Sequence, residues 1–290
     1  MPEFRRPDPR RHYNVLNPNS SQCNWGVLMR WVWFRVAAAI VAGSGVLAGL
    51  LVNIDRAARD GQDLGLVLAN YFSMFTIVSS ILSIVVLSIA AHWMRRHRGT
   101  SPEPVGIALA IAAVTGPVIL LGVVFNVLLR GEPAAIAATD PLWVANLDSW
   151  ATETLHVVLP LYFMLDLLFA TRRRGLPWRS LAVIVSYPLV WTVYTMIRGE
   201  LVPNPDGSAE WWYPYGFLDP HIAGYDSSFA YIGGILFAFL LLGVSIIGIG
   251  RYRARHAEAH DGLAAHLAAL PRVILARIRS GRRPSGPSVG

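Results

Sequence analysis

Apolar residues in this chain of 290 residues are gathered into six blocks of about 20 residues, separated by polar segments. A helix of about 20 residues is long enough to cross the ~30 Å hydrocarbon core of a membrane. The blocks therefore predict six transmembrane helices and an all-α fold, that of a polytopic membrane protein. The predicted spans are residues 33–52, 66–91, 105–129, 151–170, 178–197 and 228–250.

The polar segments outside these blocks divide the chain into three parts. Residues 1–24 are polar and rich in proline, which predicts a disordered tail. Residues 25–252 form the six-helix transmembrane domain. In the basic tail of residues 253–290, leucine and isoleucine recur at helical spacing among arginines. This pattern predicts an amphipathic helix on the membrane surface, with Pro271 as a kink or break.

The charges fix the expected orientation. All 25 basic residues are arginine. Of these, 21 lie in residues 1–35, in residues 251–290, in the loop between the second and third blocks, or in the loop between the fourth and fifth blocks. The other three loops hold four arginines against eleven acidic residues. By the positive-inside rule, both termini are cytoplasmic, and we expect a multi-pass protein of a cell membrane.

The excess of arginine also indicates which partners the protein binds and what kind of genome encodes it. Attraction to anionic lipid head groups accounts for the net charge of +7. We therefore expect membrane lipid as a partner and no nucleic acid. The use of arginine alone, without lysine, indicates a GC-rich bacterial genome. The sequence does not predict an oligomeric state.

The sequence lacks the motifs of several classes of enzyme and binding site. Cys23 is the only cysteine, so the chain can form neither an intrachain disulfide nor a cysteine metal cluster. There is no phosphate-binding P-loop, no dinucleotide fingerprint and no serine in a G-x-S-x-G elbow. We expect no cofactor and no metal. Because the predicted cytoplasmic loops are short, any chemistry must lie within the bundle or at its outer face.

The longest loop, residues 199–225, combines six aromatic residues with four prolines. Two interpretations are open. The aromatic residues could form an interfacial belt, where their amphipathic rings sit at the level of the head groups. Alternatively, the loop is an ordered lid over a cavity between the helices, which is a common use of long loops.

Polar residues inside the apolar blocks are the candidates for function, because they are costly in a membrane. His156 is the only one of eight histidines inside a block. It could be a general base, a metal ligand or a structural hydrogen-bonding residue. Glu153, three residues earlier, shares its helical face. Glu153 could orient the ring. Alternatively, its negative charge could simply be stabilised by the positive N-terminus of its helix.

Two further sets of polar residues remain ambiguous. Ser73, Thr76 and Ser80 share one face of the second block. By themselves they indicate a structural role, because such hydroxyls usually bond to backbone carbonyls or to neighbouring helices. Asp166 lies near the inner end of the fourth block. It could pair with the arginines of residues 172–174, or with a polar group on another helix.

Four segments carry a family resemblance. They are YFSMFTIVSS in the second block, LHVVLPLYFMLD in the fourth, YPLVWTVYTMIRGE in the fifth and WYPYGFLDP before the sixth. In this order and spacing they resemble bacterial six-helix proteins related to the androgen-induced, or AIG-like, membrane protein family. The resemblance covers most of residues 30–250. Animal members of that family hydrolyse fatty acid esters of hydroxy fatty acids, using a threonine in the second span and a histidine in the fourth.

The resemblance implies an intramembrane threonine-type lipid-ester hydrolase with a fatty acid ester as substrate. The positions that match the catalytic pair are Thr76 and His156. His156 would take the proton of the Thr76 hydroxyl, and water would release the acyl group. Supporting roles fall to Glu153, Ser73 and Ser80. The candidate donors to the oxyanion are Ser73, Ser80, Asn126 and Tyr194.

Two other functions fit the same residues. One is a transporter or lipid-binding membrane protein without hydrolase activity, and the other is a structural bundle. The expected depths of Thr76 and His156 in the membrane bear on the choice between these functions and the hydrolase. With straight helices and a rise of 1.5 Å per residue, Thr76 would lie roughly 15 Å deep and His156 roughly 8 Å deep. The expected offset of about 7 Å exceeds a hydrogen bond.

Overall fold

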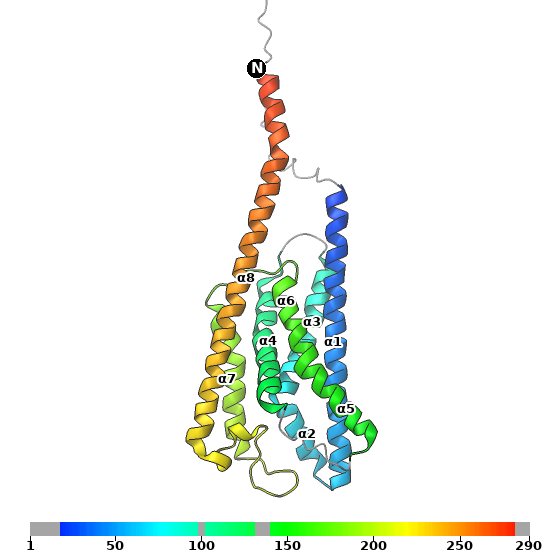
Figure 1. The fold of residues 1–290 in the computed structure, drawn as a ribbon, viewed down its shortest axis with the longest axis vertical. Helices are drawn as coiled ribbons and strands as arrows, with labels where there is room; N and C mark the ends of the chain where they lie inside the picture. The colour runs from blue at the N-terminus through cyan, green and yellow to red at the C-terminus, as the bar shows by residue number, and fades with distance from the viewer. Residues whose placement is uncertain (1–17, 98–101, 131–139, 282–290) are drawn as a thin grey trace, which may run out of the picture.

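The computed structural model describes residues 18–97, 102–130 and 140–281. Helices dominate these residues, and no strand occurs among them (Figure 1). Six helical segments are long and apolar enough to cross a membrane, which confirms the predicted all-α fold and the six spans. The protein is a multi-pass integral membrane protein. The helices that form the spans are α1 (Pro18–Asp60), α3 (Phe75–Arg96), α4 (Val105–Val124), α5 (Leu142–Glu153) with α6 (Leu159–Phe169), α7 (Ser180–Gly199) and α8 (Pro220–Gly281).

The second apolar block is not one continuous helix. It forms α2 (Leu64–Ser73) and α3, which are separated at Met74, where the backbone is extended with φ −62° and ψ 135°. The prediction of a single helix over residues 66–91 is therefore wrong at this point. The break is stabilised from outside the segment, because the Trp191 indole N–H donates a hydrogen bond of 2.9 Å to the Ser73 carbonyl.

Two spans contain π-helical turns, in which backbone hydrogen bonds join residues five apart. One turn, η2 (Phe125–Leu129), extends α4 to the end of the predicted third span. The other, η3 (Thr154–Val158), joins α5 to α6. The fourth span begins at Leu142, earlier than the predicted residue 151, because α5 adds three turns of helix before η3.

The tails differ in part from the predictions. Residues 18–24 were expected in a disordered tail, yet they belong to α1; residues 1–17 lie outside the described residues. The helix predicted within the C-terminal tail is the continuation of α8, which runs through Pro271 to Gly281. Residues 282–290 lie outside the described residues.

Helix α4 lies at the centre of the bundle and packs against α3, α6, α7 and α8, while α1 packs against α3 and α5 (Figure 1). The main apolar core joins four helices through fully buried side chains. Its best-buried members are Ala42 on α1, Leu87 on α3, Val118 on α4 and Phe163 on α6. Burial of such side chains is what fixes the positions of the helices that carry polar residues.

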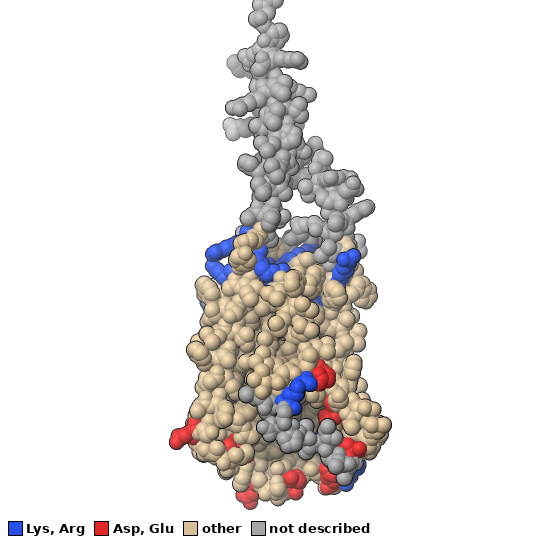
Figure 2. All heavy atoms as spheres, viewed as in Figure 1, with Lys and Arg blue, Asp and Glu red and all other residues tan. Residues whose placement is uncertain are grey.

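Charges separate between the two ends of the bundle (Figure 2). The end that carries residues 102–104 and 170–179 is the arginine-rich end, and the end that carries residues 61–63 and 200–219 is the acidic end. Helix α1 starts and α8 finishes at the arginine-rich end (Figure 1). This separation matches the charge asymmetry along the sequence. The cytoplasmic location of the arginine-rich end stays a prediction.

Four buried charges form a cluster at the arginine-rich end. The Arg35 guanidinium lies 2.6 Å from the Glu103 carboxylate and 3.4 Å from the Asp166 carboxylate, which also contacts Arg173 at 2.8 Å. Each side chain is at most 8% exposed. Asp166 thus has both expected kinds of partner, an arginine of the 172–174 cluster and a polar group on another helix. The cluster links α1, α6 and the loops that precede α4 and α7.

Candidate functional site

Thr76 owes its position to the break at Met74. It is the second residue of α3, and its side chain is 7% exposed. The backbone N–H groups in the first turn of a helix have no partner within that helix. The break therefore places the Thr76 hydroxyl beside a helix N-terminus in the interior of the bundle, an environment that favours negative charge.

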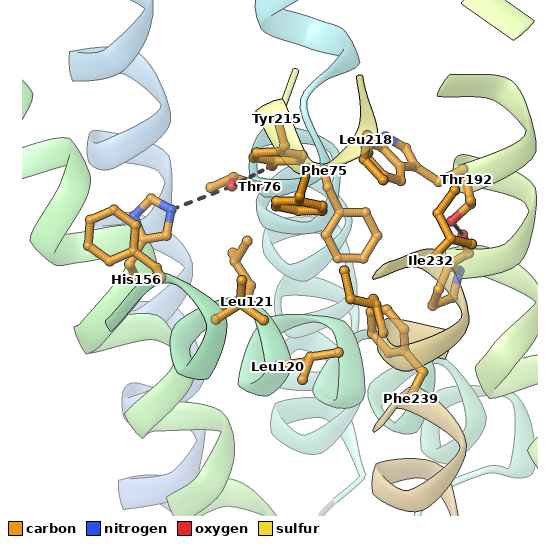
Figure 3. A pocket seen from close by; sticks show the side chains of 16 residues that line it. Phe75, Thr76, Leu120, Leu121, His156, Thr192, Tyr215, Leu218, Ile232 and Phe239 are labelled. Atoms are coloured by element: carbon orange, nitrogen blue, oxygen red, sulfur yellow. Dashed lines mark hydrogen bonds between the residues drawn. The ribbon is translucent and has the colours of Figure 1, made fainter. Parts of the chain in front are cut away.

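His156 meets Thr76 across the bundle. The ring nitrogen Nε2 lies 3.5 Å from the Thr76 hydroxyl oxygen Oγ1 (Figure 3). The offset of about 7 Å expected from straight helices is wrong for two reasons. The second span is broken just before Thr76. The fourth span starts earlier than predicted and runs obliquely through the π-helical turn that contains His156 (Figure 1).

The other ring nitrogen determines the tautomer of His156. Its Nδ1 lies 3.0 Å from the backbone carbonyl oxygen of Thr152. A carbonyl can only accept a hydrogen bond, so Nδ1 carries the proton. In a neutral ring Nε2 is then an acceptor, and it faces the Thr76 hydroxyl. The arrangement suits proton transfer from Thr76 to His156.

The π-helical turn η2 holds His156 from the opposite side. The Phe125 ring stacks on the imidazole with centroids 4.0 Å apart. The Asn126 amide donates a hydrogen bond of 2.9 Å to the His156 backbone carbonyl. Gly122, one turn earlier, allows this approach, since a Cβ atom there would lie 2.7 Å from the Pro160 ring and 3.1 Å from the His156 carbonyl oxygen.

We expect Gly122→Ala to displace the histidine. The added methyl group forces the His156 segment away from α4, and an error of about 1 Å in placing a catalytic group can cost roughly 100-fold in rate. Ester turnover by the variant measures the effect. Gly116→Ala is the matched control on the same helix, because a Cβ atom there makes an ordinary contact at 3.5 Å. Equal turnover by the two variants would show that this approach is not needed.

A third polar group completes the arrangement. The Tyr215 hydroxyl lies 3.3 Å from Thr76 Oγ1. Burial raises the pKa of the Tyr215 phenol above its ordinary value, and its contacts with the Thr76 hydroxyl and with the backbone of Thr76 and Phe75 act in the opposite direction. The protonated phenol is therefore the form present near neutral pH. Tyr215 is not among the site residues predicted from the sequence, although it lies in the aromatic loop and in the WYPYGFLDP segment.

These three side chains line an apolar cavity of about 660 Å³, including its open part. Thr76, His156 and Tyr215 lie together at one end, and the walls elsewhere are aliphatic and aromatic except at Thr192, whose hydroxyl donates to the Pro188 carbonyl (Figure 3). The walls come from α4, α7, α8 and the loop of residues 200–219. The apolar lining includes Phe75, Leu120, Leu121, Trp191, Ile232 and Phe239.

The loop of residues 200–219 closes one side of this cavity, as the lid interpretation predicts. Tyr215, Phe217 and Leu218 line the cavity from the loop. The Glu200 carboxylate anchors the loop by accepting hydrogen bonds of 2.8 Å from Tyr213 and 3.1 Å from Tyr225. The hydrogen bond from Tyr213, followed by those from Tyr225 and His221, holds the pKa of Glu200 below its ordinary value.

The residues predicted to support the pair lie in other arrangements. Glu153 does not orient His156, because its carboxylate pairs with Arg130 at 2.8 and 3.0 Å and the Thr152 carbonyl holds the ring. The Ser73 hydroxyl donates to the Ala69 carbonyl and lies 3.1 Å from the Tyr194 hydroxyl, outside the cavity lining. The Ser80 hydroxyl donates a bond of 2.7 Å to the Thr76 carbonyl and so fixes the backbone of Thr76.

Comparisons with known proteins assign no family. No family model matches the chain, and neither a curated protein nor a solved structure matches it. Among the described residues, no group of three or more His, Cys, Asp or Glu side chains is placed to hold a metal ion. The geometry around Thr76 therefore carries the functional argument.

Proposed function

We propose that the protein is an intramembrane lipid-ester hydrolase in which Thr76 is the nucleophile and His156 the general base. One observation carries the proposal. The Thr76 hydroxyl faces the unprotonated nitrogen of His156 at 3.5 Å, inside an apolar cavity. A nucleophile beside a base that a third group orients is the arrangement that covalent catalysis requires.

The reaction follows from these contacts. As the Thr76 Oγ forms a bond to the ester carbonyl carbon, its proton moves to His156 Nε2 and the carbonyl electrons move to oxygen. The tetrahedral intermediate then expels the alcohol, which takes the proton from His156. Water repeats the sequence on the acyl-threonine, with His156 again as the base. The products are the alcohol, the carboxylic acid and free Thr76, so atoms and charges balance.

The shape of the cavity supports an acyl substrate. Thr76, His156 and Tyr215 lie at one end, where the ester would react, and the rest of the lining is apolar apart from Thr192, whose hydroxyl is bonded to the Pro188 carbonyl. An acyl chain would pack its methylene groups against these apolar side chains. The AIG-like resemblance supports the same chemistry, that of a fatty acid ester.

A transporter and a purely structural bundle lack the features that would favour them. A transporter would need a polar path from Glu153 toward Asp166, yet the fully buried apolar side chains of Leu159 and Phe163 lie between them on the same span. A purely structural bundle would pack apolar side chains around Thr76 and His156, yet both residues line a cavity.

A trapped acyl-enzyme tests the proposal. The full-length protein in lipid nanodiscs is incubated with p-nitrophenyl octanoate, quenched in acid and examined by peptide mass spectrometry. We expect release of p-nitrophenol together with an octanoyl group on Thr76. Release of p-nitrophenol with the acyl group on another residue would contradict the assignment of Thr76, and no release from any acyl ester offered would contradict the hydrolase.

A further inference from the structure

A threonine hydrolase needs a donor for the oxyanion, and the candidates from the sequence are occupied elsewhere. The Ser80 hydroxyl donates to the Thr76 carbonyl. The Asn126 amide donates to the carbonyls of Gly122 and His156. Ser73 and Tyr194 contact each other and do not line the cavity. The donor must therefore be sought among the groups that line the cavity.

Few side chains of the cavity can donate a hydrogen bond. The Trp191 indole N–H is bound to the Ser73 carbonyl at 2.9 Å, and the Thr192 hydroxyl donates to the Pro188 carbonyl at 2.9 Å. Thr76 and His156 perform the proton transfer itself. Tyr215 remains, and its hydroxyl has Thr76 Oγ1 as its hydrogen-bond partner among the described side chains.

We infer that the Tyr215 hydroxyl is the oxyanion donor of this site, a catalytic role that rests on the proposed hydrolase. The hydrogen-bond chain gives it the required direction. His156 Nε2 accepts from the Thr76 hydroxyl, so the Thr76 oxygen is free to accept from Tyr215. The phenol and the imidazole approach Thr76 from different sides (Figure 3). A carbonyl oxygen bound beside Tyr215 is therefore kept apart from the base.

The backbone N–H groups at the N-terminus of α3 are a second source of hydrogen-bond donors near Tyr215. Thr76 is the second residue of the helix, where backbone N–H groups have no partner within the helix and favour nearby negative charge. The same corner of the cavity can therefore stabilise a substrate oxygen that becomes negative.

The donor acts at a defined step. When the Thr76 oxygen bonds to the carbonyl carbon, the carbon–oxygen double bond opens and its electron pair moves to the carbonyl oxygen. The Tyr215 O–H turns from Thr76 to this oxygen and donates to it without losing its proton. The bond is made only as charge develops, so it stabilises the transition state more than the bound ester.

Tyr215→Phe tests the inference, because it removes one oxygen and keeps the ring that packs against Phe217 and Trp191. Loss of one oxyanion donor typically lowers kcat about 100- to 1,000-fold. We expect a loss of this size for p-nitrophenyl octanoate in nanodiscs, with KM within about threefold of the wild type because the contact forms in the transition state. Tyr231→Phe is the matched control. Tyr231 is half-exposed on α8, and its ring, like that of Tyr215, lies against Phe217.

A second measurement separates a missing donor from a displaced loop. Replacing the carbonyl oxygen of the substrate by sulfur weakens hydrogen bonds to the developing anion. The wild type should therefore hydrolyse the thiono ester much more slowly than the ester, and Tyr215→Phe should discriminate less between the two. A variant that merely displaces the loop would lose activity on both substrates and keep the discrimination of the wild type, which would overturn the inference.

The outcomes distinguish the two proposals. If Thr76→Val is inactive while Tyr215→Phe keeps kcat within about threefold of the wild type, the hydrolase stands and the oxyanion role fails. A rise in KM at unchanged kcat would likewise reject that role, because it would indicate uniform substrate binding. If Thr76→Val hydrolyses the ester as fast as the wild type, both proposals fail.

Discussion

Thr76→Val is expected to lower ester turnover by about 1,000-fold or more, and His156→Ala by about 100- to 10,000-fold. Valine keeps the volume of threonine and removes the hydroxyl that faces His156 at 3.5 Å. Because the two residues act as one unit, the double variant should be no slower than the slower single variant. Release of p-nitrophenol from p-nitrophenyl octanoate in nanodiscs gives the rates.

A second buried threonine provides the matched control. Thr115 on α4 is fully buried, and its hydroxyl donates to the Ile111 carbonyl of its own helix. Thr115→Val makes the same chemical change outside the cavity and should retain turnover near that of the wild type. Thr76→Ser, which restores a hydroxyl, should recover part of the rate. Comparable losses in Thr115→Val and Thr76→Val would mean that the loss reports stability and not chemistry.

The six spans could be predicted because the membrane imposes their length. A hydrocarbon core of ~30 Å requires about 20 apolar residues per helix, whatever surrounds the helix. The break at Met74 could not be predicted in this way. No glycine or proline marks it. The Trp191 side chain, more than 100 residues away, bonds to the carbonyl at the break.

The candidate site was predictable only in part, for the same reason. Thr76 and His156 were selected by resemblance, whereas their distance depends on the break and on the π-helical turn η3. Tyr215 lies 139 residues from Thr76 and joins it through the fold of a loop. The role predicted for Glu153 rested on helical spacing alone, but the nearby Arg130 takes its carboxylate.

Asp166→Asn is expected to destabilise the bundle by about 3–5 kcal/mol, the typical cost of removing one partner from a buried ion pair. The substitution keeps the shape of the side chain but leaves Arg35 and Arg173 with only Glu103 as a counter-ion. Tryptophan fluorescence during heating in detergent micelles measures the change. A loss of this size corresponds to a fall of roughly 10 °C in the unfolding midpoint.

A double variant separates charge balance from lost contacts. Arg35→Met together with Asp166→Asn removes one charge of each sign and leaves Glu103 with Arg173, which is near enough to act on its pKa. If unbalanced buried charge is the main cost, the double variant is more stable than Asp166→Asn, although it has lost more contacts. If the double variant is destabilised by the sum of the two single effects, the lost contacts and not the unbalanced charge cause the loss of stability.

Asp55→Asn is the control at a partly exposed ion pair. It breaks the pair with Arg59 and should change the free energy of unfolding by no more than about 1 kcal/mol. The cluster of Arg35, Glu103, Asp166 and Arg173 would then stabilise the end of the bundle opposite the loop of residues 200–219. The helices that line the cavity would be held in place at that end without any contribution from the loop.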